Sequence, residues 1–407
     1  MNKYLAFIII LINYLTANDF KELPKRLDIT ILIHGSLRPR GKISDIVAVK
    51  NDKNVEKTDY AKSNNYLRNH SFTKQSQPMQ DIGLHKIDNS SPESSKLTAA
   101  IISELDNTKN ELMYTFGWSG LLTRSGRKAD GLKLYNEIAA EIKKLKKQNI
   151  EPKIRIIAFS HGGNVALNMA KAINENNNFK KDFLINELIL IGTPVQRDTD
   201  YLINSDLFSG IYHFYSTNDL AQKIDHISAT SHYCHQRFAP RKGFCLPKKL
   251  KQIRIRLRKA LSPRPAFTEK HYQCVNPQKA YSYSDPGHIE MWFFGWCAKG
   301  YRKNYPLFPL PVSVFTPWLV RIINKLPSTA PHITADIYPQ AGTLNLLLGT
   351  FCKTNEEYSL PFISCNNLKL IKEWSLDKKP KQNTNEIYKQ VVHEALLLGK
   401  LKKRCRG

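Results

Sequence analysis

Acidic residues are scarce in this chain, and their scarcity sets its electrostatic character. The 407 residues include 35 Asp and Glu against 61 Lys and Arg, which gives a formal net charge of +26 at pH 7. This balance favours contact with anionic surfaces such as phospholipid headgroups or envelope polymers. The sequence lacks a long Lys and Arg stripe interleaved with aromatic residues, so nucleic-acid binding is not the expected function.

The apolar run at the N-terminus is short. It covers residues 4 to 15, too few to span a bilayer comfortably. Because Lys3 precedes this run and Thr16-Ala17 ends it, the segment is typical of a secretory signal that is cut after Ala17. We therefore expect residues 1 to 17 to be a signal peptide and the mature protein to be exported, as a periplasmic, secreted or envelope-associated protein. A buried first strand is the alternative interpretation.

Cysteine occurs seven times, and its spacing does not give a pairing. An exported protein with this number is expected to hold one or more disulfides and an unpaired thiol. The segment His232-Tyr-Cys234-His235, taken with Cys245, leaves two interpretations open: a metal knuckle, or a loop closed by Cys234 and Cys245. Because the spacing matches no standard zinc pattern, we predict neither a metal site nor an organic cofactor.

Short β-rich runs alternate with helical periods over much of the chain. Runs typical of buried strands lie at residues 28 to 33, 111 to 116, 154 to 159, 188 to 191 and 211 to 215. Apolar residues recur with helical spacing at residues 97 to 105, 132 to 145 and 165 to 173. Strands separated by helices imply crossover connections, so we expect an α/β fold with a mostly parallel central sheet and helices on both faces.

The domain boundaries are less sharply marked. We expect a main domain over residues 18 to 300 and an unassigned C-terminal extension or cap over residues 301 to 407. Polar residues without an apolar period, at about 50 to 95, indicate a surface insertion, and a second insertion is expected at about 226 to 280. Inside the second, alternating Ile and Arg at residues 252 to 258 predict an amphipathic strand at a sheet edge.

The most specific motif is Ala158-Phe-Ser160-His161-Gly162-Gly163, which lies between a predicted strand and the helix that follows it. A serine there sits on a tight strand-to-helix turn, where small residues at 158 and 162 avoid a clash with neighbouring backbone. The helix N-terminus beside it favours developing negative charge. The motif predicts a nucleophile at Ser160, with an ordinary helix cap as the alternative.

Two segments together resemble the lipase and esterase branch of the α/β-hydrolase superfamily. They are Ile-Leu-Ile-His34-Gly35-Ser36 and Ala-Phe-Ser160-His161-Gly-Gly, and the similarity covers roughly residues 28 to 290. The resemblance implies an oxyanion hole made by the backbone N–H of Ser36 or Gly35 and that of His161. It also implies that His34 orients its loop and that the catalytic residues follow in the order Ser, acid, His.

A serine hydroxyl is a weak nucleophile, so it needs a histidine base and an acid that orients the base. Asp219 is the preferred acid because it follows the strand at residues 211 to 215. Asp225 is its rival, and Asp198 or Asp200 is a less favoured choice. The preferred base is His288, because its loop with Pro and Gly can present an imidazole to the site. The remaining candidate bases are His226, His232, His235, His271 and His332.

The segment Gly117-Trp118-Ser119-Gly120 follows another predicted strand and should border the pocket. Trp118 is expected either to line an acyl site or to pack in the core, and Gly35 is expected beside the substrate. The expected function is a serine-dependent ester hydrolase that acts on a lipid or other acyl ester through an acyl-enzyme on Ser160. The alternative is a catalytically inactive hydrolase-fold module that binds an anionic envelope or membrane surface.

Overall fold

The computed structural model describes the residues of 14 segments. They are 25–36, 43–59, 61–62, 82–91, 93–106, 111–175, 183–225, 228, 233–257, 285–294, 310–325, 332–340, 343–350 and 353–359. The predicted signal peptide lies outside these residues. Among the helices of the described segments, none combines the length and the hydropathy that a membrane span requires.

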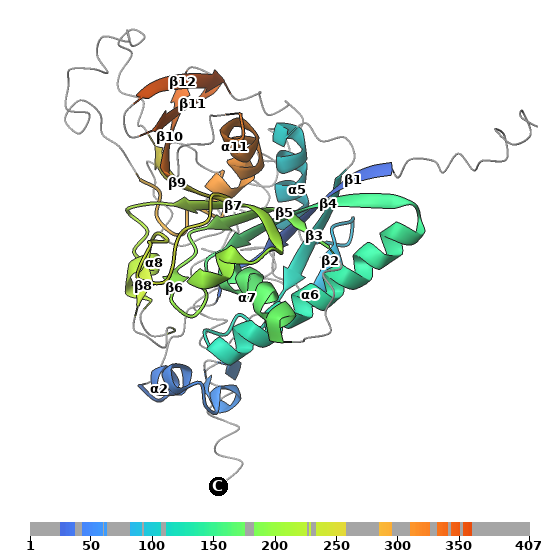
Figure 1. Cartoon of the computed structure of the whole chain (residues 1–407), viewed down its shortest axis with the longest axis vertical. Helices are drawn as coiled ribbons and strands as arrows, with labels where there is room; N and C mark the ends of the chain where they lie inside the picture. Colours follow the sequence, from blue (N-terminus) through green and yellow to red (C-terminus); the bar gives the residue numbers. More distant parts are fainter. Residues whose placement is uncertain are drawn as a thin grey trace, which may run out of the picture.

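A ten-stranded sheet runs through the molecule (Figure 1), in the order β12-β11-β10-β9-β7-β5-β4-β1-β3-β2. Its strands are β1 (Lys25–Ile33), β2 (Gly83–Lys86), β3 (Glu111–Gly117), β4 (Ile150–Phe159), β5 (Ile185–Ile191), β7 (Phe208–Tyr215), β9 (Leu250–Leu257), β10 (His332–Gln340), β11 (Thr343–Thr350) and β12 (Lys353–Ser359). Every neighbouring pair from β3 to β10 in this order is parallel. Only β2 at one edge and β11 with β12 at the other pair antiparallel. The predicted mostly parallel sheet is therefore confirmed.

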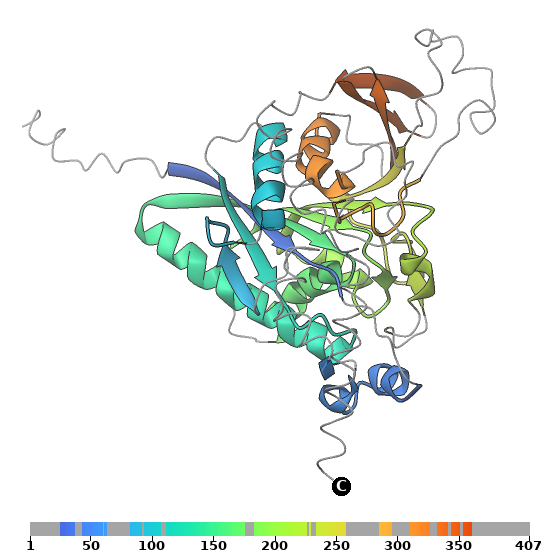
Figure 2. The ribbon, with the colours of Figure 1, turned by 180° about the vertical axis from the view of Figure 1, so that it is seen from behind.

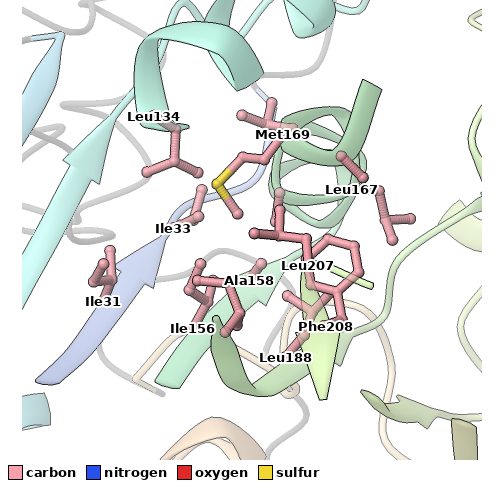
Figure 3. Packing of buried hydrophobic residues seen from close by; sticks show 14 of the residues in the cluster. Ile31, Ile33, Leu134, Ile156, Ala158, Leu167, Met169, Leu188, Leu207 and Phe208 are labelled. Carbon is pink, nitrogen blue, oxygen red and sulfur yellow. The ribbon is translucent and has the colours of Figure 1, made fainter. Parts of the chain in front are cut away.

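Helices cover both faces of this sheet. In Figures 1 and 2, α5 (Glu93–Asp106) and α11 (Thr316–Ile323) lie side by side on one face, and α6 (Arg124–Lys147) and α7 (His161–Glu175) lie on the other. Successive side chains of a strand point to opposite faces, so a strand buried on both sides must be apolar throughout. In β4, Ile157 joins the core beneath α5 and α11, whereas Ile156 joins the core beneath α6 and α7. Figure 3 shows part of the second core.

Shorter elements lie in the connections. They are α2 (Ile43–Asn51), η1 (Val55–Lys57), η2 (Asp200–Asn204), α8 (Ala221–Ile224), η3 (Val312–Phe315) and the small antiparallel pair of β6 (Val195–Gln196) with β8 (Cys234–His235). Val49 of α2 and Val55 of η1 form a separate apolar cluster with Leu122, from the loop after β3. This cluster packs α2 and η1 against the loop after β3.

Residues 332–340, 343–350 and 353–359, which lie beyond the C-terminal boundary expected at residue 300, extend the same sheet. β10 pairs parallel with β9, and α11 closes the apolar core over β7 and β9. The two expected insertions also contain parts of the sheet. β2 lies inside the first and pairs with β3, whereas β9 lies inside the second.

The prediction that the Ile and Arg segment forms an edge strand is also wrong, because β9 lies between β7 and β10. Its isoleucines pack in the core beneath α11. Its arginines are paired with carboxylates from distant segments: Arg254 binds Asp285 at 2.9 Å, and Arg256 binds Asp336 at 2.6 Å. Alternating Ile and Arg is typical of a strand with one face in solvent. In β9 the arginines are instead neutralised by carboxylates far along the chain.

β7 carries a histidine with no exposed surface. The His213 ring stacks on Tyr215 at 6.0 Å and meets Phe238 edge-on at 5.1 Å. Burial lowers the pKa of the His213 imidazole from 6.5 to about 4, because the charged form is poorly solvated there. The folded protein therefore holds this ring neutral at neutral pH.

We expect His213 to make stability depend on pH. Below pH 6.5 the unfolded chain binds a proton that the folded chain does not bind until about pH 4, so the stabilisation is complete above pH 6.5 and falls as the pH falls. The group's share of the loss is about 3 kcal/mol. Urea unfolding between pH 7 and pH 4 should show a shallower decline in His213→Phe than in wild type, while the exposed control His235→Phe should keep the wild-type slope. Equal slopes in all three proteins would contradict the burial of an uncharged ring.

Leu319 tests whether α11 belongs to the main core. Its side chain is 0% exposed beneath the helix, so Leu319→Ala should lower the free energy of unfolding by about 2–5 kcal/mol. Val47 on α2 is 48% exposed, and Val47→Ala should change it by less than about 0.5 kcal/mol. Denaturant unfolding followed by far-UV circular dichroism measures both. A main transition that is unchanged in Leu319→Ala would mean that α11 does not stabilise the sheet.

Candidate active site

Ser160 forms the turn between β4 and α7. Its φ is 53°, in the left-handed region that residues other than glycine rarely adopt. The Ser160 N–H donates to the carbonyl oxygen of Ile191 at 2.9 Å, and the Ser160 carbonyl accepts from the N–H of Gly163 at 3.0 Å. The turn is therefore held by β5 on one side and by the first turn of α7 on the other. It places the hydroxyl at the carboxyl edge of the sheet, where ligands bind in parallel α/β proteins.

The two glycines of the motif allow α7 to approach neighbouring loops closely. A Cβ on Gly162 would lie 2.3 Å from the carbonyl oxygen of His34, and a Cβ on Gly163 would lie 2.1 Å from Oγ1 of Thr193. Gly35 is equally constrained, since its Cβ would lie 3.0 Å from Cβ of Ser160. The predicted need for a small residue at 162 is confirmed, and the loop after β1 lies directly against the serine.

Three predicted site residues converge from three loops. Oγ of Ser160 lies 3.0 Å from Nε2 of His288, and Nδ1 of His288 lies 2.7 Å from Oδ2 of Asp219. The carboxylate only accepts hydrogen bonds, so Nδ1 carries the proton and Nε2 presents its lone pair to the hydroxyl. Asp219 is fully buried, Ser160 is 7% exposed, and the His288 side chain is 19% exposed. The imidazole therefore remains in contact with solvent.

The loop of Asp219 is fixed from within. Oδ1 of Asp219 accepts from the N–H of Gln222 at 3.2 Å, which leaves Oδ2 for the imidazole. The Gln236 side-chain amide donates to the carbonyl oxygens of Ser216 and Asp219, at 2.7 and 3.1 Å. Because backbone and carboxylate are both held, the acid has one orientation.

The loop of His288 is fixed by aromatic packing and by η3. The ring of Phe159, next to the serine, lies 4.6 Å from the His288 ring and stacks on Trp292 at 5.3 Å. The N–H groups of Val312 and Ser313 donate to the carbonyl oxygens of residues 290 and 291. The residues after His288 thus anchor its loop in the core, and the C-terminal segment supports it.

The acid and base loops are also bonded to each other, which sequence reasoning missed. The Ser216 hydroxyl donates to the carbonyl oxygen of Pro286 at 2.5 Å, and the Asn218 amide donates to that of Asp285 at 3.2 Å. Arg254 of β9 donates to the Asp285 carboxylate. The only signal in the sequence was the run of polar residues at 216 to 218 after an apolar strand.

His34 and Trp118 lock the loop after β1. The Trp118 indole N–H donates to the His34 carbonyl oxygen at 2.7 Å, and the Trp118 backbone N–H donates to Nε2 of His34 at 3.3 Å. The two rings stack at 5.5 Å, and both residues are fully buried. The burial of Trp118 corresponds to the core-packing alternative rather than to a residue that lines an acyl site. These contacts hold the backbone of His34, and the next residue, Gly35, packs against Ser160.

His161 is paired with Asp225, whereas the histidine beside the Ser160 hydroxyl, His288, is paired with Asp219. Nε2 of His161 lies 2.7 Å from Oδ2 of Asp225, so the rival acid pairs with His161 and not with His288. Burial holds the pKa of the His161 imidazole below its ordinary value despite this carboxylate. The backbone N–H of His161 opens α7, where the first N–H groups have no partner within the helix.

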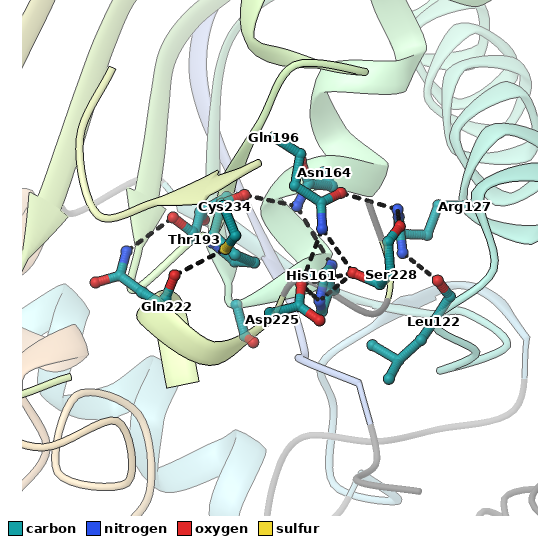
Figure 4. Close-up of polar contacts among 12 residues, drawn as sticks. Leu122, Arg127, His161, Asn164, Thr193, Gln196, Gln222, Asp225, Ser228 and Cys234 are labelled. Atoms are coloured by element: carbon teal, nitrogen blue, oxygen red, sulfur yellow. Dashed lines mark hydrogen bonds and ion pairs between the residues drawn. The ribbon is translucent and has the colours of Figure 1, made fainter. Parts of the chain in front are cut away.

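Arg127 of α6 is fully buried beside this pair (Figure 4). Its guanidinium donates to Oε1 of Gln196 at 3.0 Å and to the Ser228 carbonyl oxygen at 3.1 Å. Gln196 in turn donates to Oδ2 of Asp225 at 2.8 Å. Sequence reasoning missed this cluster. The signal was an arginine on the same helical face as Leu134, seven residues before it.

The remaining candidates lie elsewhere. Asp200 is paired with Arg241, and the acid bonded to His288 is Asp219. His235 is exposed, and His332 lies in β10; His226, His232 and His271 lie outside the described residues.

Cys234 and Cys245 are both free thiols, so the loop closed by these two residues, one of the two interpretations left open, is not formed. Cys234 is buried, donates to the Gln222 carbonyl oxygen at 2.7 Å, and has a pKa that burial raises above the ordinary value of a thiol. In the described part of the chain, no group of three His, Cys, Asp or Glu side chains is arranged to hold a metal ion.

Comparison with protein-family models finds no match for the chain, and comparison with curated proteins finds none either. The arrangement must therefore be interpreted from its own geometry. That geometry places a hydroxyl, an imidazole and a buried carboxylate in series, beside a helix N-terminus, which is an arrangement suited to nucleophilic catalysis.

Gly162→Ala should disrupt the turn. Its methyl group would meet a backbone carbonyl that cannot move aside cheaply, so we expect a loss of about 1–3 kcal/mol in the free energy of unfolding. Gly243→Asn is a matched control, since a Cβ there meets nothing within 4 Å and Asn tolerates its φ of 75°. Chemical unfolding compares the two variants. Unchanged stability in Gly162→Ala would show that α7 and the loop after β1 are not in contact.

Proposed function

We propose that this chain is a serine hydrolase of the α/β-hydrolase kind, which cleaves a carboxylic ester through an acyl-enzyme on Ser160. The observation that carries the proposal is the hydrogen-bonded series from Ser160 through His288 to Asp219, at 3.0 and 2.7 Å. The three residues come from loops after three different strands, so their convergence does not follow from closeness in the chain. Their order along the sequence is the one expected from the family resemblance.

In the first step, Oγ of Ser160 attacks the ester carbonyl carbon while Nε2 of His288 accepts the hydroxyl proton. Asp219 holds the imidazole in the required tautomer and stabilises its charged form through Nδ1. The imidazolium then gives its proton to the departing alcohol, and the acyl group remains on the serine. Water attacks this acyl-enzyme with His288 again as the base, which releases the carboxylic acid and restores the hydroxyl.

Negative charge develops on the carbonyl oxygen in both steps. The proposed donors to this oxygen are the backbone N–H of His161, which opens α7 next to Ser160, and that of Ser36 or Gly35, in the loop whose Gly35 packs against Ser160. Donors fixed before the reaction stabilise such an oxyanion without reorganising. Because Gly35 lies against the serine and His34 is locked by Trp118, this second donor is held in place.

A lipid or another acyl ester is the proposed substrate class, on the strength of the resemblance at residues 34 to 36 and 158 to 163. The proposed setting is outside the cytoplasm, because the N-terminal residues are typical of an export signal. The net charge of +26 supports a second candidate, an inactive module that binds an anionic surface.

A fluorophosphonate probe separates the two candidates, because only an activated serine displaces its fluoride and becomes phosphonylated. Wild type should be labelled and should hydrolyse 4-nitrophenyl butyrate, and Ser160→Ala should lose both properties. His288→Ala should lower kcat by about 10⁶-fold and Asp219→Asn by about 10⁴-fold. Ser209→Ala is the matched control, since this exposed serine lies at the opposite end of β7 from the acid loop.

The controls decide the interpretation. Ser209→Ala should be labelled like wild type. Folded wild-type protein that is not labelled, and that binds anionic vesicles, would favour the inactive module. Labelling that persists in Ser160→Ala would place the nucleophile elsewhere.

A further inference from the structure

Like His288, His161 has a partner at each ring nitrogen, although it transfers no proton in the proposed mechanism. His161 follows Ser160 directly, and its side chain is buried within the polar cluster of Figure 4. Its Nε2 contacts Asp225 at 2.7 Å and its Nδ1 contacts Nδ2 of Asn164 at 3.3 Å. Both ring nitrogens are therefore engaged away from the hydroxyl of Ser160.

The partners fix the protonation state of this ring. Nδ2 of Asn164 also donates to the carbonyl oxygen of Pro194 at 3.1 Å, and Oδ1 of Asn164 accepts from Thr199, so the amide cannot be reversed. Nδ1 of His161 consequently faces a donor and must accept. Nε2 faces a carboxylate and must donate. Only the neutral tautomer with its proton on Nε2 satisfies both contacts.

The charge of Asp225 is balanced by other groups. Burial alone would raise the pKa of this carboxyl, but the contacts with His161 and Ser228 and the charge of Arg127 hold it below its ordinary value. Gln196 and Ser228 link the two charged groups, because each is hydrogen-bonded to both Arg127 and Asp225. The carboxylate of Asp225 thus raises the pKa of the His161 imidazole, whereas the charge of Arg127, and that of His288 when its ring is protonated, lower it.

We infer that Asp225, backed by Arg127, is a positioning residue that holds the backbone N–H of His161 in place to bind the oxyanion. This inference rests on the proposed function. The ring of His161 is held at both nitrogens, so the backbone amide of the same residue, at the start of α7, has little freedom to turn. An amide that is free to turn must be ordered in each transition state, which reduces its contribution to catalysis.

Asp225→Asn is the first test, and a second variant guards against misfolding. Asp225→Asn leaves the buried Arg127 charge unbalanced, whereas Arg127→Met with Asp225→Asn removes both charges. The matched control is Asp106→Asn, which breaks another buried ion pair, the one between Asp106 and Arg155 of β4. His161→Gln is the conservative variant, because its amide nitrogen keeps a donor close to the position of Nε2.

The measurement is steady-state hydrolysis of 4-nitrophenyl butyrate, with active sites counted by fluorophosphonate labelling. Asp225→Asn and the double variant should both lower kcat by about 10- to 100-fold with KM nearly unchanged, which is less than the loss from deleting an oxyanion donor. Affinity for phenylboronic acid, which forms a tetrahedral adduct on the serine, should fall by a similar factor. His161→Gln should retain most of the wild-type kcat, and Asp106→Asn should retain all of it.

The outcomes are separable. Wild type that is neither labelled nor active overturns the proposed function and this inference with it. Active wild type with unchanged kcat per labelled site in Asp225→Asn and in the double variant overturns the inference alone. A similar fall in kcat for Asp106→Asn, or a fall in Asp225→Asn with no change in boronate affinity, would show a general loss of structure instead.

Discussion

The left-handed turn at Ser160 is the constraint on which the rest of the site depends. A φ of 53° costs a non-glycine residue about 1–3 kcal/mol, so the surroundings must impose it. They do so through the hydrogen bond to Ile191 in β5 and through the close approach of Gly162 and Gly163 to two loops. The same packing that enforces the turn also brings the loop after β1 against the serine. The backbone strain at Ser160 and the closeness of the loop after β1 to its side chain therefore have the same cause.

The carboxyl edge of the parallel sheet explains how the other groups reach this turn. Each strand that ends there contributes a loop, and the loops bond to one another: that of Asp219 is bonded to that of His288 through Ser216 and Pro286. The ion pair between Arg254 of β9 and Asp285 connects the loop of His288 to the sheet. Precise placement comes from the scaffold beneath the loops, and this scaffold includes η3 and α11 from the C-terminal third of the chain.

The sequence predicted what depends on short-range chemistry. The turn at Ser160 follows from a strand, small residues and a helix period within about 20 residues, and the apolar runs of β1, β4 and β5 reflect burial on both faces. It could not predict that β10 would join β9, because that pairing connects residues about 80 positions apart. Nor could it assign Asp225 or Arg127, whose buried charges are tolerated only because of partners that come from other loops.

The two carboxylates near Ser160 differ in a way that suits the proposed chemistry. Asp219 touches an imidazole that must become charged, so its own charge is useful in the transition state. Asp225 touches an imidazole whose contacts keep it neutral, and an uncompensated charge there would repel an oxyanion bound at the amide of His161. The charge of Arg127 opposes that of Asp225 and helps to hold the pKa of its carboxyl low. In the proposed mechanism, this buried arginine on α6 would therefore weaken the repulsion between Asp225 and the oxyanion.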